Sequence, residues 1–371
     1  MHKNIIIINT RVKPIYGGEE WTTQNITEEI NRYYNVTYVG YPFDIVCNKK
    51  VFPFTKFLLK FPVKKGLGRI MRKIPITKPL FVKKLDLSCD LLITNSDYDD
   101  IVILRGSTEN IHYNKILVIK HSADANFREA YPDRLLVGKK FMIVVLNKTE
   151  GAKLSKKYGE DKISVIPTGM KFKKLKPIPN YLKSKGIKLG YPILFSIGRL
   201  EDKQKNFSQA IYATSYLKKN GLAPLYLIGG EGRDRKKYES LIKHLNLSDN
   251  VKLLGKVSEE EKHTLFSIAN IVLLPSKEES LGLVMVEALK FGSILLTTKT
   301  HGSIDAIKDG YNAFFTSGAA IEIAKNILKI LSIDNKNILK IKRNARISSK
   351  KFDFQRMIIS YRSVIDKLLN T

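Results

Sequence analysis

Short apolar runs alternate with longer amphipathic stretches along the whole chain. In the first half, the runs that predict strands are 5–8, 36–39, 91–94, 101–104, 117–120, 141–146 and 164–166. In the second half they are 193–197, 225–228, 251–253, 271–274, 294–297 and 313–315. Most of these runs are continuous rather than alternating, which is typical of parallel strands covered on both faces.

Helical patterns separate the strands of the second half. Apolar residues recur with a spacing of 3.6 over 207–217, 233–245, 258–268 and 281–291. This order predicts an α/β fold with doubly wound parallel sheets. We expect two Rossmann-like domains, 1–172 and 191–350, that face each other across a cleft. The stretch 173–190 is rich in Pro, Gly and Lys and predicts a linker, and the helix 351–371 is expected to cross back to the first domain.

Length and cysteine content fit this picture. A chain of 371 residues suggests about two domains at ~150 residues each. Cys47 and Cys89 are the only cysteines, so we expect reduced thiols in a cytoplasmic protein. The apolar runs fall well short of the ~20 residues of a membrane-spanning helix. The first run, 5–8, is also too short for a signal peptide and predicts a buried strand.

The charge is strongly positive, with 64 basic and 35 acidic residues and a net charge of +29. Such a field favours polyanionic partners: nucleotide phosphates, nucleic acid or an anionic membrane. A compositional bias of the whole chain toward Lys, Ile and Asn accounts for part of this positive charge. The stretch 49–84 has twelve Lys or Arg, no acid, and interleaved aromatic residues. It predicts a segment that lies on anionic lipid, with a solvated loop as the alternative. Nucleic-acid binding is not expected, because no recognition module is visible.

The segment 275–292 carries the most informative chemistry. Glu279 follows a predicted strand, and Gly282 stands where a helix begins, so unpaired first-turn amides could bind a diphosphate there. Glu287 lies among apolar residues and would be costly to bury unpaired, whereas a ribose diol would satisfy it. The alternative interpretation is that Glu279 is an ordinary first-turn acid and Glu287 a solvated helix residue.

Two further segments follow strands of the second half. Gly198 lets the chain turn closely past a ligand, and Arg199 and Lys205 could neutralise a leaving diphosphate. A solvated basic loop is the alternative. Gly230 belongs to the turn 229–232, which could approach a nucleotide but lacks the glycine spacing of the dinucleotide fingerprint. A plain tight turn explains it equally well.

The first half offers fewer candidates. Gly17 and Gly18 precede a helical pattern and suggest a second anion-binding helix start. His121 closes the strand 117–120 at the edge that would face the cleft, although a lone histidine is usually structural. The remaining histidines that we considered lack the spacing of metal ligands: His112, His244, His263 and His301. We therefore expect no metal site.

Taken together and in this order, these segments resemble the group 1, or family 4, retaining glycosyltransferases of the GT-B fold. Glu279 and Glu287, with seven residues between them, resemble the family's Glu-x7-Glu motif. The segments 198–207, 228–232 and 164–169 resemble its basic segment, its glycine turn and the run that ends its first domain. The resemblance is strongest over 190–315.

The resemblance implies a role for each matching residue. Glu279 and His121 would reach the donor sugar, and the amides of Ser280, Leu281, Gly282 and Leu283 would face sugar and diphosphate. A further set would hold the diphosphate and the ribose: Arg199, Lys205, Gly18 and Glu287. Several positions depart from the family's pattern and put the identity of the sugar in doubt: Thr168, Met170, Lys171, Ser280, Leu281 and Asp305.

The implied reaction is the transfer of a hexose from a nucleotide donor, with UDP favoured, to a lipid-linked or cell-surface glycan. It would retain the anomeric configuration and need neither metal nor cofactor, with positive charge at the leaving group as the main catalytic effect. The protein would be cytoplasmic or peripheral on the inner membrane face. Two alternatives stay open: a nucleotide-sugar epimerase, which needs carboxylates placed for proton abstraction, and a non-catalytic protein that binds anionic surfaces.

Overall fold

A computed structural model describes residues 3–9, 18–40, 44–47, 50–53, 87–95, 111–121, 136–172, 175–188 and 191–371. Gly17, the predicted strand 101–104 and nearly all of the basic stretch 49–84 lie outside these residues. The chain divides into two compact units. The first contains Met1–Gly169 with Phe354–Thr371, and the second contains Met170–Asp353.

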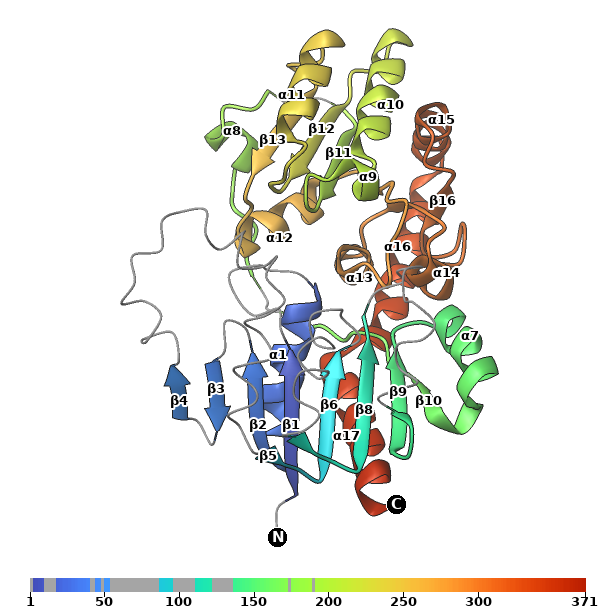
Figure 1. The fold of residues 1–371 in the computed structure, drawn as a ribbon. Coiled ribbons are helices and arrows are strands. Elements are labelled where there is room, and N and C mark those ends of the chain that lie inside the picture. The colour runs from blue at the N-terminus through green and yellow to red at the C-terminus, as the bar shows by residue number, and fades with distance from the viewer. Residues whose placement is uncertain are drawn as a thin grey trace. The chain divides into compact units, whose positions relative to one another are not determined.

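The first unit is built on an eight-stranded sheet of order β10-β9-β8-β6-β1-β2-β3-β4 (Figure 1). Its strands are β1 (Asn4–Asn9), β2 (Asn35–Gly40), β3 (Asp44–Cys47), β4 (Lys50–Pro53), β6 (Leu91–Asn95), β8 (Lys115–Lys120), β9 (Lys140–Val145) and β10 (Ile163–Val165). All pair in parallel except the β3–β4 hairpin, which extends the edge antiparallel. Two short strands, β5 (Leu87–Ser88) and β7 (Ile111–His112), pair separately. The sequence analysis did not predict the hairpin, whose two strands each begin with a charged residue.

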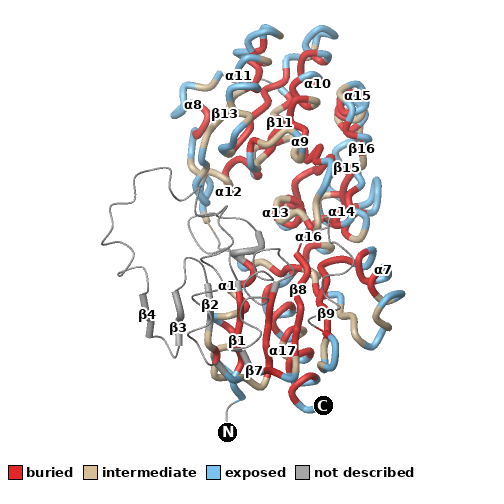
Figure 2. The backbone as a smooth tube through the Cα atoms, in the orientation of Figure 1, coloured by how far each residue is buried: buried red, intermediate tan, exposed pale blue. Residues whose placement is uncertain are grey.

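The core of the first unit explains why its strands are continuous apolar runs. Every side chain of the run 5–8 is at most 3% exposed (Figure 2). Ile5 and Ile7 pack in one cluster with the helices α1 (Gly18–Ile30) and α17 (Phe354–Asn370), while Ile6 and Ile8 pack in another that includes a residue of α7 (Lys148–Tyr158). A strand covered on both faces needs apolar residues at every position.

The second unit has a six-stranded, wholly parallel sheet of order β13-β12-β11-β14-β15-β16. Its strands are β11 (Ile193–Ile197), β12 (Leu225–Gly229), β13 (Val251–Gly255), β14 (Ile271–Leu274), β15 (Leu295–Thr298) and β16 (Phe314–Thr316). The longer helices are α10 (Phe207–Lys219), α11 (Arg235–His244), α12 (Glu259–Ile268), α13 (Leu283–Phe291), α15 (Ala320–Leu331) and α16 (Asn335–Ser349). Residues of α10, α11 and α15 share one core cluster, and residues of α12 and α13 share the other. The predicted α/β class with two largely parallel sheets is confirmed.

The stretch 173–190, predicted as a linker, is packed on the second unit in its described part. It contains the short helix α8 (Tyr181–Ser184), whose first two side chains are 4% and 7% exposed within the unit's core. The Ile178 amide donates to the Thr264 hydroxyl at 2.8 Å. The prolines and lysines suggested an exposed connection, but an aromatic and an aliphatic side chain at adjacent positions bury enough apolar surface to dock it.

Two fully buried tyrosines make a matched test of hydrogen bonding in these cores. The Tyr361 hydroxyl in α17 has no partner among the described residues, whereas that of Tyr226 in β12 lies 2.8 Å from the Ser196 hydroxyl. An unsatisfied buried polar group costs roughly 1–3 kcal/mol. We predict that Tyr361→Phe leaves the melting temperature unchanged or raises it, whereas Tyr226→Phe lowers stability by about 1 kcal/mol. Calorimetry of both variants checks this, and a marked loss of stability in Tyr361→Phe would contradict it.

Candidate functional site in the second unit

The second sheet reverses its direction of growth between β11 and β14. The chain runs from β11 outward to β13, then returns to β14 on the other side of β11. Loops that leave the carboxyl ends of two such strands diverge, and in doubly wound sheets ligands bind at this point. The loop after β11 carries Arg199 and Lys205, and the loop after β14 carries Glu279. The topology therefore brings these predicted residues to one place.

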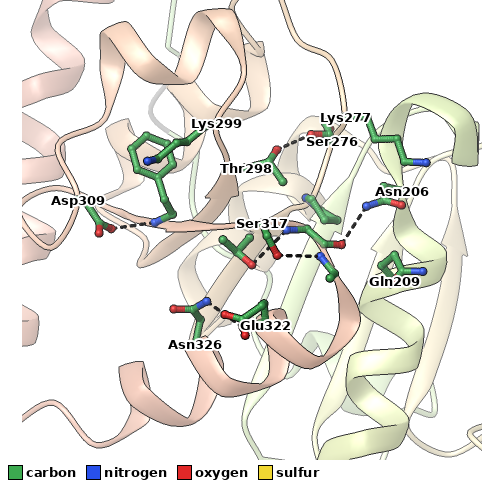
Figure 3. A pocket seen from close by; sticks show the side chains of 15 residues that line it. Asn206, Gln209, Ser276, Lys277, Thr298, Lys299, Asp309, Ser317, Glu322 and Asn326 are labelled. Atoms are coloured by element: carbon green, nitrogen blue, oxygen red, sulfur yellow. Dashed lines mark hydrogen bonds between the residues drawn. The ribbon is translucent and has the colours of Figure 1, made fainter.

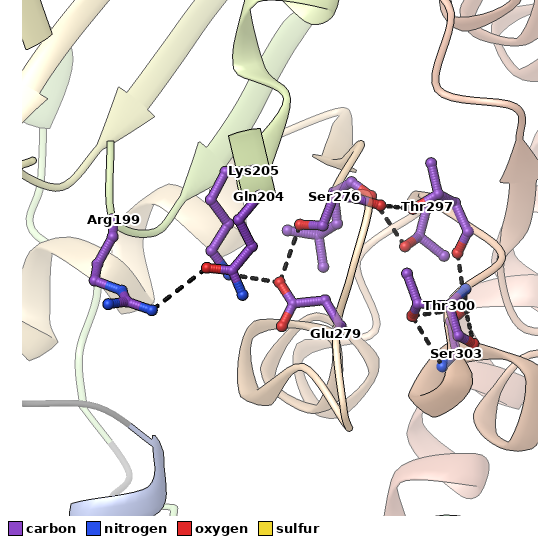
Figure 4. Close-up of polar contacts among 10 residues, drawn as sticks. Arg199, Gln204, Lys205, Ser276, Glu279, Thr297, Thr300 and Ser303 are labelled. Carbon is purple, nitrogen blue, oxygen red and sulfur yellow. Dashed lines mark hydrogen bonds and ion pairs between the residues drawn. The ribbon is translucent and has the colours of Figure 1, made fainter. Parts of the chain in front are cut away.

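A salt bridge joins the two loops. The Lys205 ammonium lies 2.5 Å from Glu279 Oε1, and the Ser276 hydroxyl donates to the same oxygen at 3.0 Å (Figure 4). Both charged side chains are partly buried, at 15% and 22% exposed. Arg199 is 61% exposed, and its guanidinium lies 3.4 Å from the Gln204 amide oxygen. A shielded pair and an open guanidinium are thus available to a ligand at the carboxyl edge.

The loop after β11 is more ordered than the sequence suggested, because Asp202 anchors it. The segment for which a solvated basic loop was the alternative interpretation contains the short helix α9 (Asp202–Lys205). The Asp202 carboxylate accepts from the amide and hydroxyl of Ser208 at 2.9 and 2.8 Å, from the Tyr238 hydroxyl at 3.0 Å and from the Lys237 ammonium at 2.7 Å. These donors belong to α10 and α11, so the scaffold fixes the turn between Arg199 and Lys205.

Glycines bring this loop against the neighbouring turn after β12. Gly230 has φ +125°, and a Cβ there would lie 1.9 Å from the Gly198 carbonyl oxygen. A Cβ on Gly232 would lie 2.5 Å from the Leu200 carbonyl oxygen. The sequence assigned Gly198 and Gly230 to close approach of a ligand. The structure shows that the two backbones approach each other, and this contact supports the segment that carries Arg199.

The Glu279 loop leads into α13 and borders a small hollow. Gly282 has φ +77° and precedes the first residue of the helix, Leu283. Gly302 supports this loop from α14 (His301–Ala306): a Cβ on it would lie 2.4 Å from Leu281 Cα and 2.6 Å from the Ser280 carbonyl oxygen. The hollow is lined mainly by residues of this loop, of α13 and of the strand ends: Lys205, Phe207, Ser276, Glu279, Leu281, Gly282, Leu283, Val284, Met285, Thr297, Thr300 and Ser303.

Glu287 lies within α13, and the structure gives it a partner that the sequence did not reveal. Its side chain is 8% exposed, and the Lys262 ammonium of α12 lies 2.5 Å from its Oε1. Burial raises the pKa of Glu287 above its usual value, and the charge of Lys262 opposes that rise. The residues that line the hollow do not include Glu287.

The first unit holds the remaining predicted residues. His121 follows β8 and is 8% exposed, and Gly18 is the first residue of α1, whereas Gly17 lies outside the described residues. Sequence reasoning missed a buried ion pair beside the histidine: the Lys120 ammonium lies 2.7 Å from Glu150 of α7. A lysine at the end of an apolar strand was the available signal.

A wider hollow opens at the carboxyl ends of β14, β15 and β16 (Figure 3). It shares Ser276 with the small hollow but contains none of the residues predicted to bind the donor. Several of its polar groups are bonded within it, since the Asn206 amide donates to the Gly318 carbonyl and the Asn326 amide to the Glu322 carbonyl. We assign the site to the small hollow, which the paired side chains of Lys205 and Glu279 line.

Metal ligands and membrane spans were sought among the described residues. That part of the chain contains no group of three or more His, Cys, Asp or Glu side chains that could hold a metal ion. Within the same residues, none of the helices has the length and apolar character needed to cross a bilayer.

Comparison with known proteins agrees with this geometry. Residues 177–348, nearly the whole second unit, match the family Glycosyl transferases group 1. Granule-bound starch synthase 1 of Manihot esculenta is 29% identical over 136 residues, which cover 36% of this chain and 22% of that protein. The uncharacterized glycosyltransferase YqgM of Bacillus subtilis is 25% identical over 240 residues, 64% of each protein. In each match the chain spans less than two thirds of the relative's length.

A solved structure covers the whole chain. Alr3699/HepE of Anabaena, solved in complex with UDP, has a TM-score of 0.72 at 17% identity and covers 98% of this chain and 100% of its own. The same protein solved with UDP-glucose has a TM-score of 0.67 at 18% identity. The fold is thus the GT-B fold of glycosyltransferases, and the chain resembles group 1 of that class. The match to the group 1 glycosyltransferases falls on the second unit.

Asp202 gives a prediction with a defined pH dependence. Burial raises the pKa of its carboxyl, but the hydrogen bonds from Lys237, Ser208 and Tyr238 outweigh this and hold it below the usual value. The stabilisation is therefore present above the ordinary pKa of ~3.9 and is lost as the pH falls through the folded-state value. We predict that Asp202→Asn costs about 1–3 kcal/mol at neutral pH.

Thermal unfolding as a function of pH measures this effect. The difference between wild type and Asp202→Asn should shrink below about pH 4, because the wild-type carboxyl is then protonated as well. Asp249→Asn, a change at an exposed carboxylate, serves as the control and should leave the melting temperature unchanged at either pH. A constant difference across the whole range would refute the ionised anchor.

Proposed function

We propose that the chain is a retaining glycosyltransferase that moves a hexose from a nucleotide diphosphate, with UDP favoured, to a glycan acceptor. The observation that carries the proposal is the meeting of Lys205 and Glu279, with Arg199 beside them, at the point where the second sheet reverses. The match of the second unit to the group 1 glycosyltransferases supports the reaction class. The UDP and UDP-glucose complexes of the Anabaena protein support the donor class.

The proposed reaction breaks the bond between the sugar's anomeric carbon and the diphosphate. The acceptor oxygen forms the new bond on the same face, and its proton passes to the leaving diphosphate oxygen. Arg199, Lys205 and the first-turn amides of α13 offer positive charge to the diphosphate as it leaves. Glu279 is already paired with Lys205, so we assign it to the sugar hydroxyls rather than to covalent attack. His121 and Gly18 would contact the donor from the first unit.

This scheme supplies the leaving-group charge from side chains, so we propose that no metal is required. Adding a chelator should leave the rate unchanged. Incubation with a panel of nucleotide sugars, with and without a membrane extract, tests the reaction class. Nucleotide release that needs the extract supports transfer, whereas conversion of the sugar without an acceptor would favour an epimerase. The absence of any release or conversion, with folded protein, would favour a non-catalytic role.

The acceptor is proposed to be a lipid-linked or cell-surface glycan, met at the inner face of the membrane in polysaccharide biosynthesis. The proposal rests on the sequence of 49–84, whose lysines and aromatic residues suit an anionic lipid surface. A cytoplasmic enzyme bound electrostatically to the membrane surface would encounter its acceptor by diffusion along that surface.

The turnover number of an Arg199→Ala variant tests the leaving-group role. One well-aimed donor to a developing oxyanion is worth about 3 kcal/mol, so turnover should fall about 100-fold. Folding should survive, because the side chain is largely exposed. Arg343→Ala, on the exposed side of α16, is the matched control and should retain normal turnover. Near-normal turnover in Arg199→Ala would contradict the assignment of Arg199 to the leaving diphosphate.

Sedimentation with vesicles tests the membrane proposal. The wild-type protein should pellet with vesicles of phosphatidylglycerol and stay in the supernatant with phosphatidylcholine. Replacing Lys64, Lys65, Lys83 and Lys84 by glutamine should weaken pelleting, because each lysine near such a surface contributes about 1 kcal/mol. Raised salt should have the same effect. Equal recovery in the supernatant with both lipids would remove the membrane from the proposal.

A further inference from the structure

A buried ion pair joins α12 and α13 behind the candidate site. The Lys262 ammonium lies 2.5 Å from Glu287 Oε1 and 2.9 Å from Glu259 Oε1. The Lys262 and Glu287 side chains are only 18% and 8% exposed. Helix α12 begins with a capping box, in which the Ser258 hydroxyl accepts from the Glu261 amide and the Glu261 carboxylate from the Ser258 amide. The first turn that carries Glu259 and Lys262 is therefore fixed in place.

We propose that Lys262 is a positioning residue that holds Glu287 as an oriented carboxylate for the ribose hydroxyls of the donor. This inference rests on the proposed function and specifies how its nucleotide is recognised. Lys262 occupies Oε1 of Glu287, so the other oxygen is directed away from the pair. A vicinal diol presents two donors, and only an ionised carboxylate accepts from both without itself being a donor.

The charges around Glu287 favour this role. Burial raises its pKa, Lys262 lowers it, and Glu259 raises it to a smaller extent. Burial would lower the pKa of Lys262, but Glu287 and Glu259 outweigh this and raise it, so the ammonium keeps its proton. Without Lys262, the Glu287 carboxyl would still be buried and close to Glu259. Both effects raise its pKa and so favour its neutral form.

The other charged or titratable side chains near α13 make their contacts close to its C-terminus. His263 of α12 packs edge-on against the Phe291 ring, with centroids 4.7 Å apart. Arg346 of α16 donates to the Phe291 carbonyl at 3.1 Å. Lys290 lies over the Phe172 ring, 5.3 Å from its centroid. Among the described residues, Lys262 is thus the cation whose ammonium contacts the Glu287 carboxylate.

Titration calorimetry with ribose and 2′-deoxyribose nucleotides tests the proposal. UDP, GDP and ADP are compared with their 2′-deoxy counterparts, so that the identity of the base does not limit the result. The wild type should prefer a ribonucleotide about 10- to 100-fold, the range expected for one hydrogen bond to a charged group. Lys262→Met should reduce this preference toward one at neutral pH, as should Glu287→Gln.

The pH profile separates positioning from a merely structural role. In Lys262→Met the preference should return only as the pH is raised, because burial and Glu259 then hold the pKa of Glu287 up without the opposing charge of Lys262. In the wild type it should appear at lower pH, and Lys262→Arg should behave like the wild type. The matched control is Lys185→Met, which breaks the 2.7 Å pair between Lys185 and Glu261 on the same helix and should leave the preference intact.

The outcomes distinguish this inference from the proposed function. Thermal melts first establish that each variant is folded; if Lys262→Met is not, the profile of Lys262→Gln is used. An unchanged preference with no shift of the pH profile would overturn the positioning role while the donor site stands. A wild type that binds ribo- and deoxyribonucleotides equally would also overturn it, because Glu287 then does not read the ribose. A folded wild type that binds none of the nucleotides would overturn the proposed function itself.

Discussion

The ion pair between Lys205 and Glu279 is the contact on which the candidate site depends. It joins the loops after β11 and β14, neighbouring strands between which the second sheet changes direction. Loops at such a point diverge and would leave their charges apart, so a short, shielded pair fixes their spacing. Each partner also suits one end of a nucleotide sugar: the ammonium a phosphate, the carboxylate a hydroxyl. A bound donor would thus replace the contact between Lys205 and Glu279 with its own contacts to the same two side chains.

Buried lysine–carboxylate pairs occur in both units. Lys262 meets Glu287 between two helices, and Lys120 meets Glu150 between a strand and a helix. Pairs of this kind add little net stability, because desolvation offsets their attraction, but removing one partner leaves a costly buried charge. Their effect is to select one arrangement of the chain. In the second unit, that arrangement sets the carboxylate proposed to read the ribose.

The sequence predicted the parts of the structure that local pattern determines. The runs 5–8 and 193–197 became central strands because burial on both faces requires uninterrupted apolar residues, and 258–268 carried both a cap and a helical spacing. Lys205 and Glu279 could both be assigned to the donor site because both follow strands of a parallel sheet, but the ion pair between them was not predicted. Asp202 and Lys262 could not, because their partners are set by tertiary packing, and one lysine among many basic residues has no local mark.

At two glycines the sequence analysis identified the right positions but gave a different reason for the glycine than the structure does. Gly198 and Gly230 were expected to let a ligand approach, yet a Cβ on Gly230 would meet the Gly198 carbonyl oxygen. In the same way, a Cβ on Gly302 would meet the backbone of Ser280 and Leu281. Backbones packed this tightly cannot shift independently. The loops that carry Arg199 and Glu279 are therefore supported by backbone packing within the protein. A methyl group added at Gly230 or Gly302 would act on the donor through the geometry of these loops, which is why the shape of this site cannot be separated from the packing beneath it.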